Sequence, residues 1–254
     1  EAHLAFASGT IDESALQPWM IDYLERVGRR PDMQRVDAVT HRLLRLAPGD
    51  RVLEVGSGLG DDAVALARIV GPSGHVTAVD LSSDFVALAR RRAHEAGVDM
   101  EFHVGDMAAL DLPDAAFHGV RGERSAQYTA DPGAVVAELT RVVRPGGHVV
   151  LAEPDWGSMA ADIDDIGLVN EITTWWLTTL RAQGFHPRIG LQLPGLFHRA
   201  GLVDIEVEVV TVIERSRDGA GELLPLFIRE APPEMAFLTE GFPRYHEWRD
   251  ALDA

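Results

Sequence analysis

Residues 52–60 read VLEVGSGLG, a short apolar segment that runs into three closely spaced glycines. From Asp61 to Val70 the apolar residues recur at helical spacing, so the whole stretch predicts a strand, a tight loop and a helix. Glycine permits unusual backbone angles and, because it has no Cβ, lets a ligand approach the main chain closely. The segment therefore predicts a ligand-binding loop at the carboxyl end of a strand.

The spacing of these glycines separates the possible nucleotide ligands. A dinucleotide fingerprint, G-x-G-x-x-G, would place its third glycine at position 61. That position is Asp61, and a carboxylate at a helix N-terminus would repel a pyrophosphate, which disfavours NAD and FAD. Glu54 lies inside the strand, where it is either a surface carboxylate or a group that holds a positively charged ligand or orders the loop.

Strands and helices continue to alternate as far as residue 152. The apolar segments predict strands at 51–55, 75–79, 100–104, 117–121 and 148–152, and helices at 61–70, 84–96 and about 131–143. We predict a turn at residues 144–147, which read RPGG. This order is typical of an α/β fold with a parallel sheet and right-handed crossovers, which binds ligands beyond the carboxyl ends of its strands.

The flanking segments are mainly helical. Residues 11–46 show two helical patterns separated by Gly28 and Pro31. After residue 152 the pattern predicts a long helix at 162–183, a short helix at 193–200 and a strand with one wet face at 203–213. Residues 221–254 are interpreted as helical with proline interruptions.

Acidic residues follow the next two strands as well. Asp80 ends the second strand, where a carboxylate can accept both hydroxyls of a ribose. Asp106 follows the third strand and suits the exocyclic amine of adenine, and Met107 offers an apolar surface to the ring. Together with the glycine loop, these acids indicate a cationic nucleoside ligand without phosphate. S-adenosylmethionine has this chemistry.

Composition excludes several other chemistries. The chain has 254 residues and a formal net charge of −17, which argues against nucleic acid as a partner. It has no Cys, and all 23 basic residues are Arg, so thiolate, Schiff-base and P-loop lysine chemistry are excluded. No apolar run approaches the roughly 20 residues that cross a bilayer, and the N-terminus shows no secretion signal. We expect no membrane partner and a cytoplasmic location.

Four segments together resemble the class I S-adenosylmethionine-dependent methyltransferases: VLEVGSGLG, VTAVDLSSDFVALAR, FHVGDM and RVVRPGGHVVLAEPDW. The resemblance is strongest to the menaquinone and ubiquinone methyltransferase branch, which includes many small-molecule tailoring enzymes of natural product biosynthesis. It implies a Rossmann-like, mostly parallel seven-stranded sheet with helices on both faces. It also implies S-adenosyl-L-methionine as cofactor, held by Glu54, Gly56, Ser57, Gly58, Asp80, Leu81, Asp106 and Met107, with backbone contacts from Arg121.

The same resemblance implies a division of the chain. Residues 1–46 are expected to form a helical cap over the cofactor, and residues 47–254 the methyltransferase core, with substrate-covering helices at about 157–200. Tyr23, and less strongly Arg30, is a candidate partner of the methionine carboxylate. The family fold ends in a hairpin of strands six and seven. Either residues 222–229 form the seventh strand or it is missing because the chain is truncated, and we expect truncation.

The substrate side is expected beyond the fourth and fifth strands. Catalytic candidates are Tyr128, which stands where relatives often have His, together with Asp155 and His186, since histidine ionises near neutral pH. The non-catalytic alternatives are a packing side chain for Tyr128, a turn residue for Asp155 and a surface loop residue for His186. The substrate-binding candidates are Gln127, Glu153, Trp156 and Arg188. The ten histidines form no cluster with metal-ligand spacing, so no metal is predicted.

These observations favour methyl transfer to oxygen, carbon or nitrogen of a small, apolar or aromatic metabolite. One alternative is an S-adenosylmethionine-binding protein that catalyses a different reaction, such as cyclisation or decarboxylation. A nucleotide-linked oxidoreductase and a methylase of nucleic acid or protein are further alternatives. The sequence leaves open whether the protein is a monomer or a homodimer.

Overall fold

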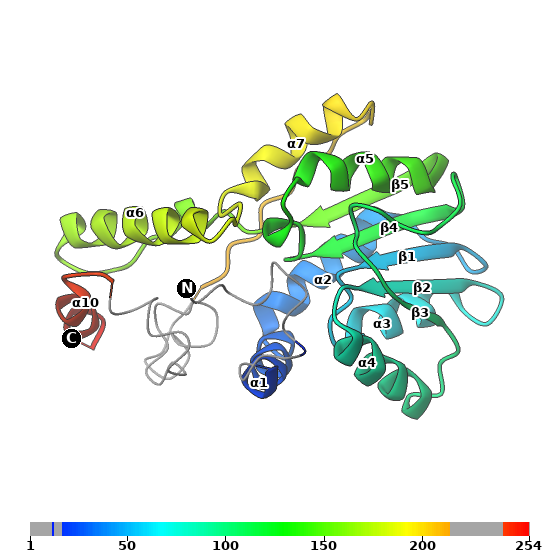
Figure 1. The fold of residues 1–254 in the computed structure, drawn as a ribbon, viewed down its shortest axis with the longest axis horizontal. Coiled ribbons are helices and arrows are strands. Elements are labelled where there is room, and N and C mark those ends of the chain that lie inside the picture. The colour runs from blue at the N-terminus through cyan, green and yellow to red at the C-terminus, as the bar shows by residue number, and fades with distance from the viewer. Residues whose placement is uncertain (1–11, 13–16, 214–240, 254) are drawn as a thin grey trace.

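The computed structural model describes residues 12, 17–213 and 241–253 (Figure 1). Five strands form one sheet: β1 (Arg51–Val55), β2 (His75–Asp80), β3 (Glu101–Val104), β4 (Phe117–Glu123) and β5 (Val143–Ala152). Their order is β3-β2-β1-β4-β5, and every neighbouring pair is parallel. The α/β prediction is confirmed. The strand order reverses between β1 and β4, which is where open parallel sheets bind ligands.

Helices cover both faces of the sheet. On one face, α3 (Asp61–Val70) and α4 (Ser83–Glu95) pack against β1, β2 and β3, and α2 (Pro31–Leu44) packs against β4 and β5. On the other face, α5 (Pro132–Val142) buries Leu139 and Val142 against Leu53 and Val120. Because the central strands are covered on both faces, β1 and β2 each have four consecutive buried residues, most of them apolar. This two-sided burial fixes the strand ends and the loops that follow them.

The beginning of β5 differs from the sequence prediction. The predicted turn at residues 144–147 lies inside the strand, which begins at Val143 rather than His148. The register shifts there, because β5 advances from Val143 to His148 while β4 advances only from Phe117 to Gly119. The four residues therefore form a bulge within β5, with Gly146 at φ 75°. The sequence prediction identified these turn-forming residues but placed them before the strand, whereas they lie within it.

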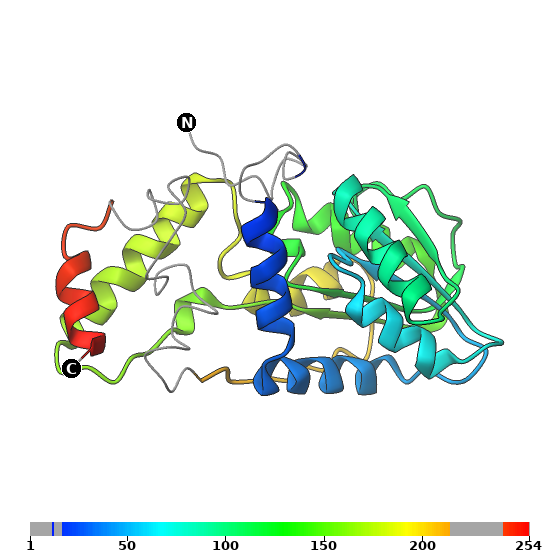
Figure 2. The ribbon, with the colours of Figure 1, turned by 90° about the horizontal axis from the view of Figure 1, so that it is seen from below.

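Three further helices lie beyond the carboxyl ends of the strands (Figure 1). Two N-terminal helices are present as expected, α1 (Gln17–Gly28) and α2, and α1 lies between the sheet and the pair formed by α6 (Ile166–Ala182) and α10 (Tyr245–Asp253) (Figures 1 and 2). Trp176 of α6 and Trp248 of α10 are fully buried in one apolar cluster. The short helix predicted at 193–200 begins earlier, as α7 (Ile189–Arg199), and contains Pro194.

The strand predicted at residues 203–213 is not formed: these residues are described and belong to no strand. The alternation instead serves contacts with α2, since Glu206 and Glu208 form ion pairs with Arg45 and Arg42. The valines that alternate with them, Val207 and Val209, are exposed by 62% and 87%. An alternating pattern determines which side chains lie on the same side of an extended segment. It does not supply a neighbouring strand to hydrogen-bond with, so residues 203–213 do not belong to a sheet. The possible last strand at residues 222–229 lies outside the described residues.

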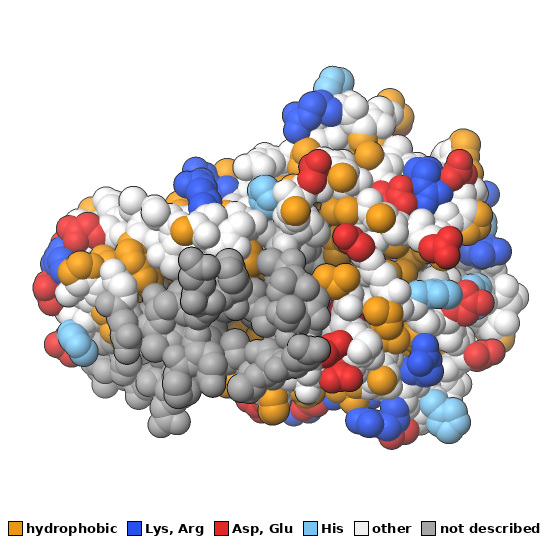
Figure 3. Space-filling view, in the orientation of Figure 1, with side chains coloured by type: hydrophobic (Ala, Val, Ile, Leu, Met, Phe, Trp, Pro, Cys, Tyr) orange, Lys and Arg blue, Asp and Glu red, His pale blue; other side chains and the backbone are white. Residues whose placement is uncertain are grey.

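The face of the molecule seen in Figure 3 carries no large field of one sign. Acidic and basic side chains are interspersed over the α/β half of the molecule (Figure 3). None of the helices in the described ranges has both the length and the apolar character that crossing a bilayer requires.

Candidate functional site

A cavity of about 480 Å³ opens at the carboxyl edge of the sheet, between the loops after β1 to β4 and the inner side of α1. Most sequence-predicted cofactor residues line it: Tyr23, Glu54, Gly56, Ser57, Gly58, Asp80, Leu81, Asp106 and Met107. Among the predicted catalytic and substrate residues, Gln127, Tyr128 and Trp156 line it as well. The remaining candidates lie elsewhere: Arg30, Arg121, Glu153, Asp155, His186 and Arg188 are not in its wall.

The glycine loop is shaped by close packing. Gly56 has φ 65°, and a Cβ on it would lie 2.4 Å from the Cβ of Ser125 in the loop after β4. Gly60 has φ 84°, and its Cβ would lie 2.8 Å from that of Ala89 on α4. Both positions combine a backbone region that favours glycine with a space that no side chain can occupy. The loop therefore presents bare backbone to the cavity.

Asp80 fixes this loop from the neighbouring strand. Its Oδ2 accepts a hydrogen bond from the backbone N–H of Gly58 at 2.8 Å, and its Oδ1 accepts one from Ser82 at 2.9 Å. Burial raises the pKa of Asp80, and these two backbone donors oppose the shift. A carboxylate oxygen has two lone pairs, so each oxygen of Asp80 can accept one further hydrogen bond from a ligand.

The third strand tip is more open. Asp106 is exposed, and its Oδ1 accepts from the N–H of Ala108 at 2.8 Å, which closes a tight turn. Met107 follows at the cavity wall. Across the cavity, α1 contributes Met20 and Tyr23, and α1 is tied to α4 by an ion pair between Glu25 and Arg92. The helix thus covers the cavity with apolar and aromatic surface.

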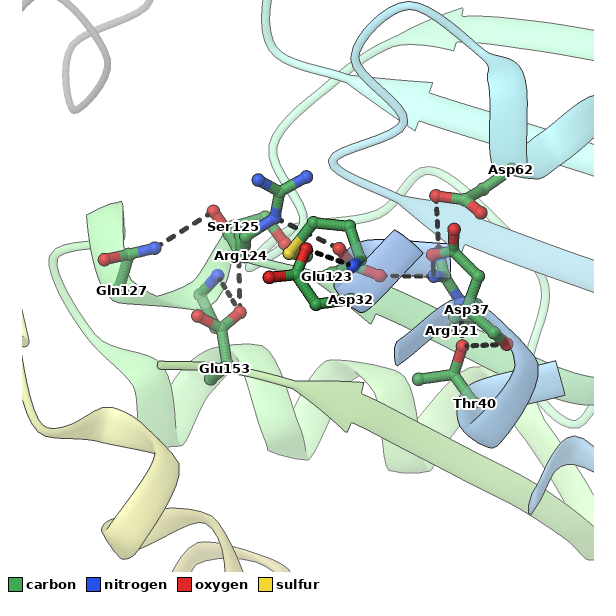
Figure 4. Close-up of polar contacts among 12 residues, drawn as sticks. Asp32, Asp37, Thr40, Asp62, Arg121, Glu123, Arg124, Ser125, Gln127 and Glu153 are labelled. Atoms are coloured by element: carbon green, nitrogen blue, oxygen red, sulfur yellow. Dashed lines mark hydrogen bonds and ion pairs between the residues drawn. The ribbon is translucent and has the colours of Figure 1, made fainter. Parts of the chain in front are cut away.

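A buried charge cluster lies under the cavity floor (Figure 4). The guanidinium of Arg121 is fully buried and pairs with four carboxylates, those of Glu54 at 2.6 Å, Glu123 at 2.5 Å, and Asp37 and Asp62 at 3.1 Å. The side chain of Arg121 therefore organises the floor and does not enter the cavity. Glu54 and Arg121 are direct partners in the β1–β4 register, so opposite charges inside two apolar strands were the signal for this pair.

Carboxylates outnumber cations in this cluster. Burial, with repulsion from Asp62 and Glu123, raises the pKa of Asp37 to about 8. Burial also raises the pKa of Glu54 to about 8, because it outweighs the attraction of Arg121. Asp37, Asp62 and Glu123 have oxygens close enough to share a metal ion, but each is paired with the guanidinium of Arg121. The geometry of these three side chains is accounted for by that ion-pair cluster.

Sequence reasoning missed Arg124, a basic side chain in the cavity wall. Its Nε donates to Glu123 Oε1 at 3.0 Å, while its two terminal nitrogens point away from Glu123 and have no hydrogen-bond partner among the described residues (Figure 4). Arg30, the arginine singled out from sequence, instead makes a two-point contact with Asp32, at 3.0 and 2.7 Å. The signal for Arg124 was its place just after β4.

Glu153 stabilises the loop after β4 and does not face the cavity. Its Oε1 accepts from the backbone N–H groups of Ser125 at 2.9 Å and Ala126 at 2.7 Å (Figure 4). Burial raises the pKa of Glu153 to about 7 in spite of these donors. The carboxylate therefore holds the segment that carries Gln127 and Tyr128 against the tip of β5.

Three aromatic side chains complete the substrate side. Trp156 donates from Nε1 to Gln127 Oε1 at 2.9 Å, which links the loops after β5 and β4. Tyr128 packs edge to face against Phe185, with ring centroids 5.0 Å apart. Burial, with the charge of Tyr23 adding to it, raises the pKa of Tyr128, so its phenol stays protonated. These contacts form an apolar wall with hydrogen-bonding groups at its edge.

The last three candidates gather in the loop before α7. Asp155 Oδ1 accepts from Arg188 Nε at 2.9 Å and caps the short turn at residues 156–158. His186 and Arg188 line a second cavity, of about 340 Å³. The structure therefore brings His186, Arg188 and Asp155 near one another but separates them from the cavity that holds Asp80 and the glycine loop.

The residues of the first cavity fit an S-adenosyl nucleoside. Gly56 and Gly60 have no room for side chains, Asp80 keeps lone pairs for ribose hydroxyls, and carboxylates in the wall suit a sulfonium cation. Arg124 offers an unused fork of donors to a carboxylate.

Comparison with known proteins agrees with this fit. Residues 52–147 match a family model described as a methyltransferase domain. A 37.1 kDa protein in transposon TN4556 of Streptomyces fradiae is 34% identical over 227 residues, 89% of this chain and 64% of that protein. Demethylmenaquinone methyltransferase of Bacillus cytotoxicus is 32% identical over 121 residues, 47% of this chain and 51% of that enzyme. The chain thus spans less than two thirds of either relative.

The solved structure of the [4+2]-cyclase SpnF superposes with a TM-score of 0.57 and 24% identity, covering 86% of this chain and 73% of that one, which shows a shared fold. The matched domain, the fold and the cavity chemistry lead to one conclusion. The segment at residues 52–147 is therefore a methyltransferase domain, similar to that of the S-adenosylmethionine-dependent class I enzymes, and S-adenosyl-L-methionine is the cofactor that the first cavity fits.

Proposed function

We propose that the protein transfers a methyl group to oxygen, carbon or nitrogen of a small, apolar or aromatic metabolite. The observation that carries this proposal is one cavity that joins the glycine loop and Asp80 to Tyr23, Tyr128 and Trp156. Its volume of about 480 Å³ is typical of small-molecule sites. A role in natural product biosynthesis and a cytoplasmic location are part of the same proposal.

The cofactor roles follow from the position of each side chain in the wall. Asp80 accepts hydrogen bonds from the ribose hydroxyls, and Asp106 accepts one from the exocyclic amine of adenine. Met107 packs against the adenine ring. Arg124, with Tyr23 opposite, binds the methionine carboxylate, because its terminal nitrogens have no other partner among the described residues. Glu54 pairs with Arg121 beneath the glycine loop and orders the floor of the site. S-adenosylmethionine supplies a methyl group activated by its sulfonium.

The chain contributes mainly by positioning, since methyl transfer is an in-line displacement that depends on near-attack geometry. Tyr128, held protonated by burial, donates a hydrogen bond to the acceptor and does not act as a base. The hydrogen bond between Gln127 and Trp156 holds both side chains in place, and together they orient the methyl acceptor. Glu153 and Asp155 position the loops that carry these side chains. Residues 1–46 cap the cofactor, and the segment 157–200 covers the substrate.

A non-methylating reaction such as cyclisation or decarboxylation is the alternative, supported by the fold that this chain shares with the SpnF cyclase. Product analysis separates the two. Release of S-adenosylhomocysteine in step with turnover supports methylation, whereas turnover with intact cofactor supports the alternative.

The test of the proposed site is cofactor binding measured by isothermal titration calorimetry. Wild type should bind S-adenosylhomocysteine and not NADH. Asp80→Ala should weaken binding by about tenfold to a hundredfold, because the ribose hydroxyls lose a charge-assisted acceptor. Asp111→Ala removes an exposed carboxylate outside the cavity wall and should leave the affinity unchanged. Equal affinity of the two variants, or binding of NADH, would refute the site.

A further inference from the structure

The second cavity has the opposite charge character to the first. Eight carboxylate residues line the first cavity. Among the described residues, the second has no Asp or Glu in its wall and is lined by Arg181, His186 and Arg188, with Phe185 and Gln192. The formal net charge of the chain is −17, so a cavity lined by basic residues is unexpected from the composition of the chain. In Figure 3, basic and histidine side chains lie close together where α6 gives way to α7.

Arg188 is held in place before any ligand arrives. Its Nε donates to Asp155 Oδ1 at 2.9 Å, and its two terminal nitrogens have no hydrogen-bond partner in the part of the chain that the structure describes. The guanidinium lies over Gly157, where an added Cβ would be 2.6 Å from Nε. A guanidinium fork that is anchored at Nε and open at both terminal nitrogens matches the two oxygens of a carboxylate or phosphate.

Arg181 adds a second guanidinium from the last turn of α6. It is exposed, and no described carboxylate forms an ion pair with it. Arg188 keeps two open terminal nitrogens although Asp155 pairs with its Nε. Arg181 adds a charge that no described carboxylate neutralises, so this concave site has a local positive potential that attracts anions.

The second cavity adjoins the substrate side of the first. Ala130 lines both cavities. The wall between them is the segment after β4, where Tyr128 packs on Phe185 and the backbone N–H of His186 donates to the carbonyl of Gln127 at 2.8 Å. One molecule that passes Ala130 can therefore place an apolar part in the first cavity and a charged end in the second.

We propose that the second cavity is an anion subsite, in which Arg188 and Arg181 bind a carboxylate or phosphate group of the acceptor. The inference rests on the proposed function, since it assigns the acceptor an anionic end and an apolar body. It narrows the substrate class from small apolar metabolites to amphipathic acids or phosphate esters.

The subsite can be tested by titrating the full chain, saturated with S-adenosylhomocysteine, with inorganic phosphate, acetate and octanoate. The readout is the Nε–H resonance of Arg188 in ¹H–¹⁵N NMR spectra. Saturable shifts are expected for the anions, and the tighter of phosphate and acetate identifies the preferred head group. Octanoate should bind about tenfold tighter than acetate or better, because its chain reaches the apolar wall beyond Ala130.

Three variants separate position from overall charge, with affinities followed at shifting backbone resonances. Arg181→Gln should weaken anion binding by about fivefold, the scale of an exposed charge contact. Gly157→Ala keeps every charge but displaces the Arg188 guanidinium, so it should weaken anion binding similarly. Arg91→Gln removes an exposed arginine of α4 outside both cavities and should change nothing.

Absence of saturable shifts, or equal anion affinity in all three variants, would overturn the subsite. Equal affinity of octanoate and acetate would overturn its connection to the first cavity. The affinity for S-adenosylhomocysteine is measured alongside and should be the same in all variants. If wild type fails to bind S-adenosylhomocysteine, the proposed function fails, whatever the anions do; if it binds, loss of anion binding refutes the subsite alone.

Discussion

Replacing Arg121 with Met should destabilise the protein strongly at pH 8 and less at pH 5.5. Arg121 is fully buried and pairs with four carboxylates, so its removal leaves their charges without the central cation. Removing one partner of a buried ion pair costs about 3–5 kcal/mol. In a chain of this length that corresponds to a fall in Tm of about 6–20 °C.

The pH dependence follows from the raised pKa values in the cluster. Burial raises the pKa of Glu54 from 4.5 to about 8 and that of Asp37 from 3.8 to about 8. The folded chain therefore binds these protons more tightly than the unfolded chain, and their contribution to stability is lost as pH rises from about 4 to 8. At pH 5.5 both carboxyls are protonated in the folded state. Arg121 then faces two carboxylate charges. At pH 8, which equals the raised pKa values, Glu54 and Asp37 are each about half ionised and Arg121 faces about three charges, so the loss at pH 5.5 should be about two thirds of that at pH 8.

Urea denaturation of wild type and variant at the two pH values measures this difference. Arg26→Met, which removes an exposed helical ion pair with Asp22, is the control and should cost less than about 1 kcal/mol at either pH. The reasoning is refuted if Arg121→Met costs no more than the control, or if its cost is equal or greater at pH 5.5.

Two further predictions concern the cofactor cavity. Gly56→Ala should lower the affinity for S-adenosylhomocysteine and destabilise the fold by about 1–3 kcal/mol, because the new Cβ meets Ser125 at a positive φ. The control is Gly97→Ala, which is also at positive φ but has no atom within 4 Å of the new Cβ. It should lower the stability less and leave S-adenosylhomocysteine binding intact. Calorimetry or thermal melts in which Gly97→Ala is the more damaging of the two variants would contradict the packing argument. Arg124→Gln should weaken S-adenosylhomocysteine binding by about tenfold through loss of the methionine carboxylate partner, whereas Arg91→Gln should not; equal calorimetric affinities would remove Arg124 from the site.

Local patterns predicted the elements that pack on both sides. The strands from β1 to β4 and the helices between them were identified within a few residues, because two-sided burial leaves apolar runs bounded by glycines and caps. The strand predicted at residues 203–213 was wrong because its pattern comes from a long-range contact and not from burial in a sheet. Alternation there reflects glutamates that pair with arginines in and just after α2, a contact between segments more than 150 residues apart that no local window contains.

The site shows the same division between local and long-range information. Residues on the strand tips, such as Gly56, Asp80 and Asp106, were found because parallel topology brings consecutive strand ends to one edge. Side-chain direction was not predictable: Arg121 turned under the floor toward Glu54, while Arg124, three residues later, entered the wall. His186 was expected beside the reacting atoms and lies instead in a second cavity.

The amino-acid order alone determined the α/β architecture, the glycine loop and the acids at the next two strand ends. Each of these follows from periodicity or from the conformational freedom of one residue type, and both act over a few neighbouring positions. Only the tertiary structure decided which charges neutralise one another, which side chains face the ligand and where a basic cavity forms in an acidic chain. Those outcomes depend on burial and on distances between remote segments, and both exist only after the chain has folded.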